Sequence, residues 1–539
     1  MKFRIILYNF SFCMLICSSG FTQPTISWTK CYGGSSDDYS RTIIKTSNNG
    51  FLIVGGASSF DGDVTGIHGD IDSVTGNMFT LGDAWVVKTD SLGNIEWQKC
   101  LGGSGIDVGI SSVETQGGYV VLCSSNSFDG DVHNNHFSRD YWLVKLDYTG
   151  NIIWEYSYGG IHEEQVYGLA TTPDGGFVLS GRQHSLDNGD VVGHHGSANT
   201  TDIWVVKVDS AGILQWQKCL GGTSGELIGV VAVDSIGNIY IAARTGSTDG
   251  DVNVNCNYTL HNFWLVKLDQ NGTIAWDRCY GGTGGQEINS IQIQDRKILL
   301  SGWSGSSDGD LTHNYGYRDA WILVTDTSGN IIFSQSYGGS QTDEMLDACF
   351  LDNGNIVACG YTISNDSDVT FNYSPYGFGH GWLICTDSLG NLLWQKVYGG
   401  SSIDRLISII SDQHGVIRFL GTTDSPNNGD VVGSHGMYDL WLVNLDILTG
   451  INEINNAAFL KVYPQPFSEE IHIQFPTSFP VNKFYSINLV DLQGKIIKTT
   501  SVIEGNEILI KPVSNFEAGW YLLEFILNDK PYYFKVLKM

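Results

Sequence analysis

Hydrophobic and polar residues alternate along most of the chain in short runs that end at turn-forming residues. The runs 39–46 and 95–100 alternate with a period of two, and residues 51–56 and 85–89 are similar short strand-like runs. Asparagine and glycine separate these runs, as in Asn48-Asn49-Gly50. Period-two alternation bounded by such residues is typical of β-strands joined by tight turns. The pattern predicts four strands in the first unit of the chain.

The same unit recurs along the sequence. A Gly-Gly pair follows Tyr or Leu at intervals of 57 to 69 residues, and the longest interval contains an insertion at residues 70–79. Four strands that recur about every 60 residues are typical of a propeller blade. The sequence therefore predicts an all-β, seven-bladed β-propeller. The first glycines of the pairs are Gly33, Gly102, Gly159, Gly221, Gly281, Gly338 and Gly399.

Tryptophans indicate how the ring closes. Seven third strands carry a tryptophan, from Trp85 to Trp441, and seven fourth strands carry an aromatic residue, from Trp28 to Trp394. The fourth-strand series starts first and the third-strand series ends last, so the last blade lacks its own outer strand. We expect residues 26–32 to supply that strand beside residues 440–445, which removes an open sheet edge. We interpret the tryptophans as packing residues between blades.

The order of Tyr-Gly-Gly, acidic residue, strand, Gly-Asn turn and tryptophan resembles the bacterial β-propeller repeat family. The resemblance covers about residues 23–446. It implies the propeller fold and says little about activity, because one fold hosts many functions.

The pattern changes after Gly450, where the Gly-Gly unit no longer occurs. Short strands such as 471–475 and 487–490 predict a small β-sandwich as the C-terminal domain. Four motifs follow in order, namely residues 462–467, 491–495, 519–521 and 534–538, and together they resemble the type A sorting domain of type IX secretion in Bacteroidota. The resemblance implies that the type IX secretion machinery is a partner and that the protein reaches the cell surface or the extracellular space. The sorting motif comprises Tyr463, Pro464, Pro466, Asp491, Gly494, Lys495, Gly519, Tyr521 and Lys535.

The N-terminus predicts a signal peptide at residues 1–22. Lys2 and Arg4 precede a mostly apolar run to Cys17, and small residues follow. No later stretch has the length of a transmembrane helix, so we expect no transmembrane segment in the mature chain. We accordingly divide the chain into signal peptide (1–22), propeller (23–450), linker (451–458) and sorting domain (459–539).

The negative charge is concentrated in the propeller. Residues 23–452 contain 48 acidic and 19 basic residues, a net charge of −29, whereas residues 453–539 contain 9 acidic and 8 basic residues. No basic stripe is present to displace the counterions of a nucleic acid, so nucleic-acid binding is disfavoured. Cations or neutral ligands suit this surface better.

The acidic residues of the propeller follow the repeat. Asp-Gly-Asp, or a variant of it, occurs between the second and third strands of each blade, and a second acid follows each Gly-Gly pair. The loop motif comprises Asp61, Asp63, Asp129, Asp131, Asp249, Asp251, Asp308 and Asp310, with variants at Asp190, Asp368 and Asp430. The second set is identified as Asp37, Asp107, Glu163, Glu226, Glu287, Asp343 and Asp404, and histidines follow several loops at His68, His133, His195, His313 and His435.

Blade topology places both acidic motifs on one face of the ring. Two interpretations of the loop aspartates stay open at this stage. They can accept hydrogen bonds from backbone N–H groups of tight loops, or they can bind Ca²⁺ together with loop carbonyl groups. Ca²⁺ is therefore the one cofactor that the sequence leaves open.

The sequence does not indicate an enzyme. It contains no Gly-x-Ser-x-Gly or His-Glu-x-x-His motif and no phosphate-binding glycine loop. The departures from the repeat are His162-Glu163-Glu164, Arg139, Arg318 and Arg405, which do not obviously converge. We expect a binding or adhesion protein that uses the acidic loop face for a glycan or protein ligand. The alternatives are a secreted hydrolase acting on polysaccharide and a structural surface protein.

Nine cysteines follow Gln23. Cys31, Cys100, Cys219 and Cys279 occupy one repeat position, which indicates a small buried site. Cys349 and Cys359 flank a turn, where either a cross-hairpin disulfide or two free thiols fit the spacing.

Overall fold

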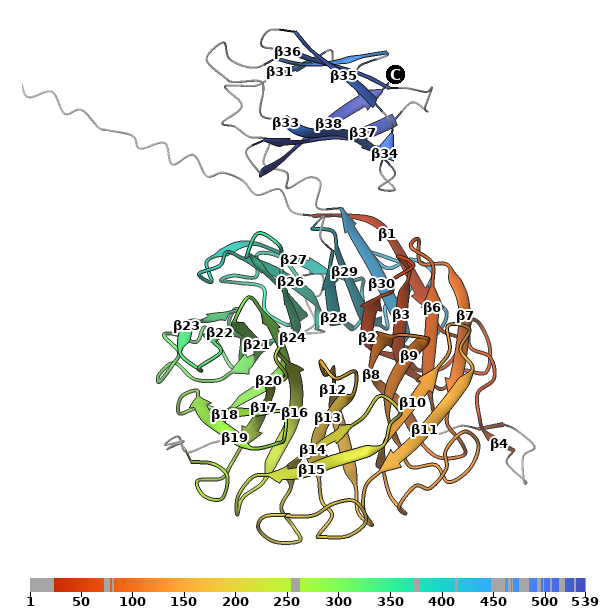
Figure 1. The fold of residues 1–539 in the computed structure, drawn as a ribbon, viewed down its shortest axis with the longest axis vertical. Helices are drawn as coiled ribbons and strands as arrows, with labels where there is room; N and C mark the ends of the chain where they lie inside the picture. Colours follow the sequence, from red (N-terminus) through yellow and green to blue (C-terminus); the bar gives the residue numbers. More distant parts are fainter. Residues whose placement is uncertain are drawn as a thin grey trace, which may run out of the picture. The chain divides into compact units, whose positions relative to one another are not determined.

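The structure, a computed structural model, consists of β-strands throughout its described part (Figure 1). It forms two units, one at residues 25–446 and one that includes residues 447–539. The described residues are 24–71, 78–79, 82–253, 262–372, 379–412, 415–446, 461–463, 467, 469–474, 484–491, 496–497, 499–504, 507–512, 519–527 and 530–538.

The larger unit is a seven-bladed propeller in which each blade is a four-stranded antiparallel sheet. The innermost strands surround the centre of the ring (Figure 1). In chain order from the axis outward, blade one contains β2 (Asp38–Lys45), β3 (Phe51–Ala57), β6 (Asp83–Thr89) and β7 (Ile95–Leu101); blade two contains β8 (Asp107–Thr115), β9 (Gly118–Ser125), β10 (Asp140–Leu146) and β11 (Ile152–Tyr158). Blade three contains β12 (Glu164–Thr171), β13 (Phe177–Gln183), β14 (Asp202–Val208) and β15 (Leu214–Leu220); blade four contains β16 (Glu226–Val233), β17 (Ile239–Thr245), β18 (Asn262–Leu268) and β19 (Ile274–Tyr280).

The remaining blades repeat this arrangement, and a short hairpin, β4 (Asp70–Ile71) and β5 (Met78–Phe79), forms the insertion in blade one. Blade five contains β20 (Gln286–Gln294), β21 (Lys297–Ser304), β22 (Asp319–Asp326) and β23 (Ile331–Tyr337); blade six contains β24 (Asp343–Phe350), β25 (Ile356–Thr362), β26 (His380–Thr386) and β27 (Leu392–Tyr398). Blade seven contains β28 (Asp404–Ser411), β29 (Ile417–Thr423), β30 (Asp439–Asp446) and, as its outer strand, β1 (Thr25–Tyr32).

The predicted closure of the ring is confirmed. β1 pairs antiparallel with β30, with Cys31 opposite Trp441 and Tyr32 opposite Leu440. The buried Trp441 indole donates from Nε1 to Thr29 Oγ1 across this pair (2.6 Å). Third-strand tryptophans bond the outer strand in the same way in other blades, as Trp85 does to Gln98 (2.7 Å). The strand from the start of the chain thus replaces both the hydrogen-bond ladder and the side-chain acceptor of an ordinary fourth strand.

The core lies between neighbouring blades. The second and third strands of each blade are buried almost throughout, and the third-strand tryptophans are fully buried from Trp85 to Trp441. Because a blade has neighbours on both faces, these strands need apolar residues on both sides, which accounts for their continuous apolar sequences.

The smaller unit contains two four-stranded antiparallel sheets. One has the order β31 (Lys461–Tyr463), β32 (Ile471–Gln474), β36 (Glu507–Pro512) and β35 (Thr499–Glu504). The other has the order β34 (Ile496–Ile497), β33 (Phe484–Asp491), β37 (Gly519–Leu527) and β38 (Lys530–Lys538). Buried residues such as Ile473, Leu489 and Leu523 come from both sheets, as expected for a small sandwich.

Of the two alternatives left open for Cys349 and Cys359, the structure shows the pair of free thiols. Both cysteines are buried free thiols, and Cys349 lies opposite Val357 rather than Cys359 across the hairpin. Cys31, Cys100 and Cys219 are also buried and free, whereas Cys279 at the same repeat position is disulfide-bonded.

Candidate functional site: the loop face and the channel mouth

The Asp-Gly-Asp loops lie against the Gly-Gly links of their own repeats. In blade one, Asp61 Oδ1 accepts a hydrogen bond from Ser35 N (2.7 Å), and Asp63 N donates to Gly33 O (2.9 Å). Each of the other blades repeats these two bonds, for example Asp129 with Ser104 and Asp308 with Thr283. The first residue of the motif therefore joins the loop between the second and third strands of a blade to the Gly-Gly link that precedes its first strand, and both connections lie on one face of the ring.

The middle residue of the motif needs an unusual backbone conformation. Gly62 has a φ of 66°, and a Cβ on it would lie closer than 3.0 Å to Gly33 O. Glycine adopts positive φ without steric cost. Blade six has Ser367 at this position with a φ of 54°.

All eight residues predicted to bind Ca²⁺ lie in these loops, where amides and hydroxyls already occupy several carboxylate oxygens. Hydrogen bonds from Ser35 and Thr223 hold the pKa of Asp61 and Asp249 below the usual range. Within the described ranges, no group of three or more His, Cys, Asp or Glu side chains is arranged to hold a metal ion. The structure thus shows the backbone interaction in detail, and Ca²⁺ binding stays a prediction.

The second acidic set lies deeper than the loops. The first residue of each inner strand is fully or almost fully buried, and its side chain reaches the second glycine of the Gly-Gly pair. Asp107 Oδ2, for example, accepts from Gly103 N (2.9 Å) and from Ser127 Oγ (2.6 Å). The residues in this position are Asp38, Asp107, Glu164, Glu226, Gln286, Asp343 and Asp404.

Three residues of the predicted second set are therefore wrong by one position. Asp38, Glu164 and Gln286 fill the buried position, instead of the adjacent Asp37, Glu163 and Glu287. The buried residue stands five positions after the first glycine of the pair in all seven blades, so this constant spacing was the signal that could have identified it.

A third ring of polar residues was missed in the sequence. The first residue of each third strand is buried, and it stands two positions before the third-strand tryptophan. The regular spacing of Asp-x-Trp was the signal that could have revealed it. The ring consists of Asp83, Asp140, Asp202, Asn262, Asp319, His380 and Asp439.

Histidines connect this third ring to the loops of the next blade. His68 Nδ1 lies 2.7 Å from Asp83 Oδ2, and its Nε2 lies 3.9 Å from Asp131 Oδ2 of blade two. The hydrogen bond that His68 makes to the Asp83 carboxylate raises the pKa of His68. His195 and His435 form equivalent bridges. In blade two the bridging residue is His136 and not His133, which is exposed and contacts Glu155.

Two departures from the repeat, Arg318 and Arg405, come together at the inner edge of the same face through Glu344 and Tyr361, whereas Arg139 pairs with Glu163 at another blade junction. Directly after the buried acid, a cross-strand pair joins the first and second strands of each blade, and its composition changes from blade to blade. We call these residues, together with Arg139, Glu163, Tyr317 and Arg318 that lie beside them, the mouth ring: Tyr39/Gly56, Val108/Ser124, Gln165/Arg182, Leu227/Arg244, Glu287/Trp303, Glu344/Tyr361 and Arg405/Thr422.

Contacts within the mouth ring run from blade to blade. Arg139 pairs with Glu163 (3.1 Å) and Arg244 with Glu287 (3.1 Å). The densest cluster lies over blades five to seven, where the Arg318 guanidinium stands 4.0 Å from the Trp303 ring centroid and 3.5 Å from Glu344. Arg405 lies over Tyr361 (4.9 Å). Burial raises the pKa of Glu344, and hydrogen bonds from Tyr361 and Arg318 oppose that rise.

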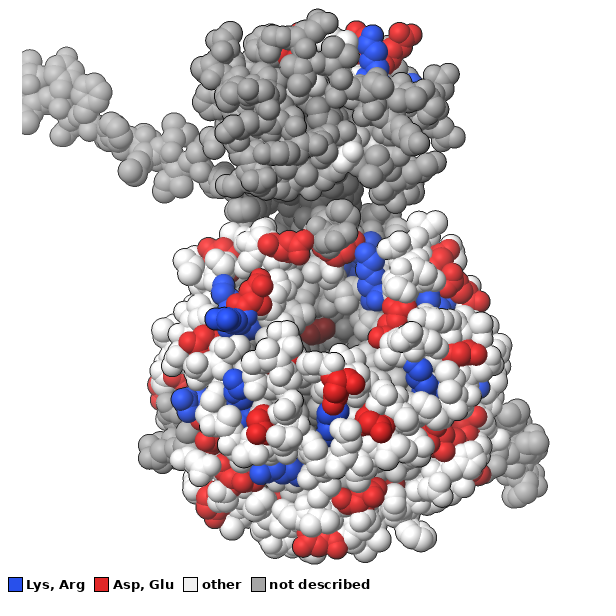
Figure 2. Space-filling model, in the orientation of Figure 1, with Lys and Arg blue, Asp and Glu red and all other residues white. Residues whose placement is uncertain are grey.

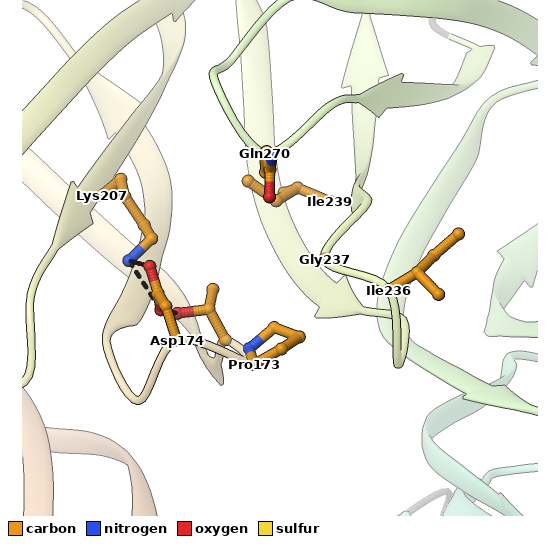
Figure 3. A pocket seen from close by; sticks show the side chains of 8 residues that line it. Pro173, Asp174, Lys207, Ile236, Gly237, Ile239 and Gln270 are labelled. Carbon is orange, nitrogen blue, oxygen red and sulfur yellow. Dashed lines mark hydrogen bonds and ion pairs between the residues drawn. The ribbon is translucent and has the colours of Figure 1, made fainter.

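Figure 2 shows one face of the propeller, which is hollowed at the centre of the ring and carries acidic side chains over the blades with fewer basic ones between them. A separate small pocket of about 50 Å³ lies between turns of blades three and four (Figure 3). There Lys207 pairs with Asp174 (3.1 Å) beside Pro173 and Ile236. These turns are at the opposite ends of the strands from the mouth ring.

Residues 461–538 match the family model described as secretion system C-terminal sorting domain. The C-terminal unit is a type IX sorting domain. The protein is therefore exported to the cell surface or the extracellular space, and the sorting domain engages the secretion machinery. Tyr463, Asp491, Gly519, Tyr521 and Lys535 lie on strands of this domain, with Tyr521 buried and Tyr463 donating to Glu507 (2.7 Å). Pro464, Pro466, Gly494 and Lys495 lie outside the described residues.

Solved structures with a similar fold share little sequence with this chain. A crystal structure of puromycin hydrolase is similar with 11% identity and a TM-score of 0.43, covering 84% of this chain and 61% of the hydrolase. A member of the DUF4221 family from Bacteroides vulgatus has 7% identity and a TM-score of 0.31, covering 62% of this chain and 91% of that one. No curated protein matches the sequence. Among the described residues, no helix has the length and apolar character needed to cross a membrane.

Proposed function

We propose that the sorted propeller is a binding protein and that its ligand site is the mouth ring over blades five to seven. The observation that carries the proposal is the contrast between two adjacent sets of residues. A buried polar residue after Gly-Gly and a loop of the Asp-Gly-Asp type recur in every blade, whereas the mouth ring beside them differs between blades and gathers Trp303, Arg318, Glu344, Tyr361 and Arg405. A repeated frame that carries non-repeated side chains suits recognition.

The residue types favour a ligand with an apolar face and hydroxyl groups, and we propose a glycan. Tyr317 is 73% exposed beside Arg318, with a distance of 5.6 Å from its ring centroid to the guanidinium. Aromatic rings and arginine supply large, partly apolar contact surfaces together with hydrogen-bond donors. Glu344 adds an acceptor whose side chain is 12% exposed. The same residue types also occur at protein-binding sites, so the experiment includes protein ligands.

The test uses the mature full-length protein on a panel of immobilised glycans and extracellular matrix proteins, with Ca²⁺ and with a chelator. For a glycan that binds, we expect Tyr317→Ser with Arg318→Ala to weaken binding at least about tenfold, equivalent to about 1.4 kcal/mol. The matched control is Ile236→Ser, which removes a 78% exposed apolar side chain from the opposite face. Equal loss in both variants, or binding to proteins only, contradicts a glycan site at the mouth ring.

A further inference from the structure

Two rings of buried polar residues meet at each junction between blades. The third-strand residue of one blade faces the inner-strand residue of the next one across the Gly-Gly link. A Cβ on Gly33 would lie closer than 3.0 Å to oxygens of both Asp439 and Asp38, and a Cβ on Gly159 closer than 3.0 Å to oxygens of both Asp140 and Glu164. The first glycine is needed because two carboxyl groups fill the space of its side chain.

Five of the seven junctions pair two acids. Their third-strand members each have one oxygen, Oδ1, that is buried and has no hydrogen-bond partner. The other oxygen, Oδ2, accepts from a backbone amide, as Asp319 Oδ2 does from Tyr315 N (2.6 Å). The pairs are Asp83/Asp107, Asp140/Glu164, Asp202/Glu226, Asp319/Asp343 and Asp439/Asp38.

The other two junctions contain natural replacements for the acid pair. Asn262 faces Gln286 at one junction, and a Cβ on Gly281 would contact Oδ1 of the first and Oε1 of the second. His380 faces Asp404 at the other, with 3.2 Å between Nδ1 and Oδ2. Both replacements bring an N–H donor to the junction. His380 supplies an imidazole N–H, and the Asn262 side-chain amide supplies its NH₂ when its oxygen and nitrogen positions are exchanged. Neither junction contains two carboxylates.

Two ionised carboxylates at such a site would repel each other without water to screen them. We propose that each of the five acid pairs holds one proton between its two carboxyl groups. One carboxyl O–H then donates the hydrogen bond that an amide or imidazole N–H donates at the other two junctions. The Oδ1 atom of the third-strand acid is the position for this proton, because it is unpartnered at all five junctions, whereas the facing acid has an unpartnered oxygen only at Asp107 and Glu164.

The electrostatic environment agrees with this assignment. Burial raises the pKa of Asp140 and Asp439 to about 6 and that of Glu164 and Asp319 to about 7. Because the two acids of a pair share the proton, these values describe the pair rather than one residue. At the Asp140/Glu164 junction the other ionisable groups are His136 and Asp190.

The Asp319/Asp343 junction is best suited to a test, since Tyr315 occupies the place where other blades have a bridging histidine. Asp343 Oδ2 accepts from Gly339 N (2.8 Å) and Ser364 Oγ (2.8 Å), and Thr362 donates to its Oδ1. The neighbouring ionisable groups are Asp368, the Tyr315 hydroxyl and, through Asp368, His313. The Arg318 guanidinium pairs with Glu344 instead.

A carboxyl group with a raised pKa in the folded state favours folding below its unfolded pKa, and this contribution is lost as the pH rises through the folded pKa. The melting temperature of the full-length mature protein should therefore fall between about pH 5 and about pH 8. Asp319→Asn supplies a permanent N–H donor, so it should raise the melting temperature at the higher pH and flatten the profile. The double variant Asn262→Asp with Gln286→Glu adds a sixth acid pair and should steepen the profile.

Asp352→Asn is the control, because it removes one negative charge from an exposed turn and should leave the profile unchanged. The infrared C=O absorption of a protonated carboxyl group, recorded on the native protein at neutral pH, provides a second measurement that needs no variant to fold. Loss of part of this absorption in Asp319→Asn supports the proposal. Absence of the absorption in the native protein overturns it. A rise in melting temperature with Ca²⁺ at about pH 8 that Asp319→Asn abolishes, and that Asp308→Asn with Asp310→Asn leaves unchanged, also overturns it, because a cation would then occupy the pairs.

Discussion

Carboxylates accept backbone hydrogen bonds at two depths in this propeller, and the depth decides how much the loss of one bond costs. Exposed aspartates of the Asp-Gly-Asp loops accept amide hydrogen bonds in water, as Asp61 does from Ser35. Asp107 performs the same bonding while fully buried, where burial raises its pKa. A lost hydrogen bond costs more at the buried position because water cannot replace the missing acceptor.

We expect Asp107→Ala to lower the free energy of unfolding by about 1–3 kcal/mol, since Gly103 N and Ser127 Oγ lose their acceptor. Chemical denaturation in urea measures the change. Asp129→Ala, in the exposed loop of the same blade, is the matched variant and should have a clearly smaller effect. If the two variants are equally destabilised, depth does not decide the importance of these carboxylates.

Calcium binding by the loop aspartates makes a separate prediction. At a hundredfold excess over its dissociation constant, a bound ion would stabilise the protein by about 2.7 kcal/mol per site. Melting curves in millimolar Ca²⁺ and in chelator at one pH should then differ, and Asp308→Asn with Asp310→Asn should reduce the difference. Superimposable curves would leave these residues with the backbone contacts seen for Asp308 and Thr283 alone.

Strands and turns were predictable from sequence to the extent that they repeat. The alternation of residues, the Gly-Gly spacing and the tryptophan series predicted the blades and the closing strand because each occurs seven times. The mouth ring was not predictable, because Arg318 and Glu344 meet only through the packing of blade five on blade six. Sequence spacing carries no information about a contact between residues that belong to different repeats and do not recur.

In the closing strand, Thr29 accepts the hydrogen bond of the third-strand tryptophan, a bond that other blades form with a different residue type, such as Gln98. Thr29→Val removes the acceptor of the buried Trp441 N–H and should cost about 1–3 kcal/mol of unfolding free energy. Thr29→Gln should retain most of the stability, since a glutamine accepts the corresponding hydrogen bond from Trp85, Trp204 and Trp382. Thermal melts of both variants test the idea, and equal destabilisation would contradict it.

The middle residue of each Asp-Gly-Asp loop has a positive φ, and substitutions there test how much this conformation costs. Gly62→Ala should destabilise the protein, because the new Cβ would meet Gly33 O at a positive φ. Ser367→Gly, at the same position of blade six, relieves a left-handed conformation that costs an ordinary residue roughly 1–2 kcal/mol. The urea midpoint should thus fall for the first variant and rise for the second, with an unchanged slope.

For the whole molecule, folding and sorting belong to different units. The sorting residues lie in the C-terminal unit, and the propeller completes its ring with residues 25–446. We expect deletion of residues 459–539 to leave a folded propeller that stays in the periplasm. Fractionation of cells that express the full-length and the truncated proteins measures the outcome, with protease resistance as the control for folding. Equal display of both proteins at the surface would contradict the assignment.

The pairing of β1 with β30 has a consequence for the order of events during biosynthesis. The strand that leaves the ribosome first has no place in the ring until the last blade has been synthesised, some 410 residues later. Contacts between such distant segments form slowly, because a long chain must first be brought together. Once the last blade exists and until β1 pairs with it, two strand edges are exposed, and the early strand of one molecule fits the late edge of another equally well. Crowding of half-made chains would thus favour exchanged pairs of molecules, so the rate of synthesis and the supply of chaperones help to decide whether single rings form.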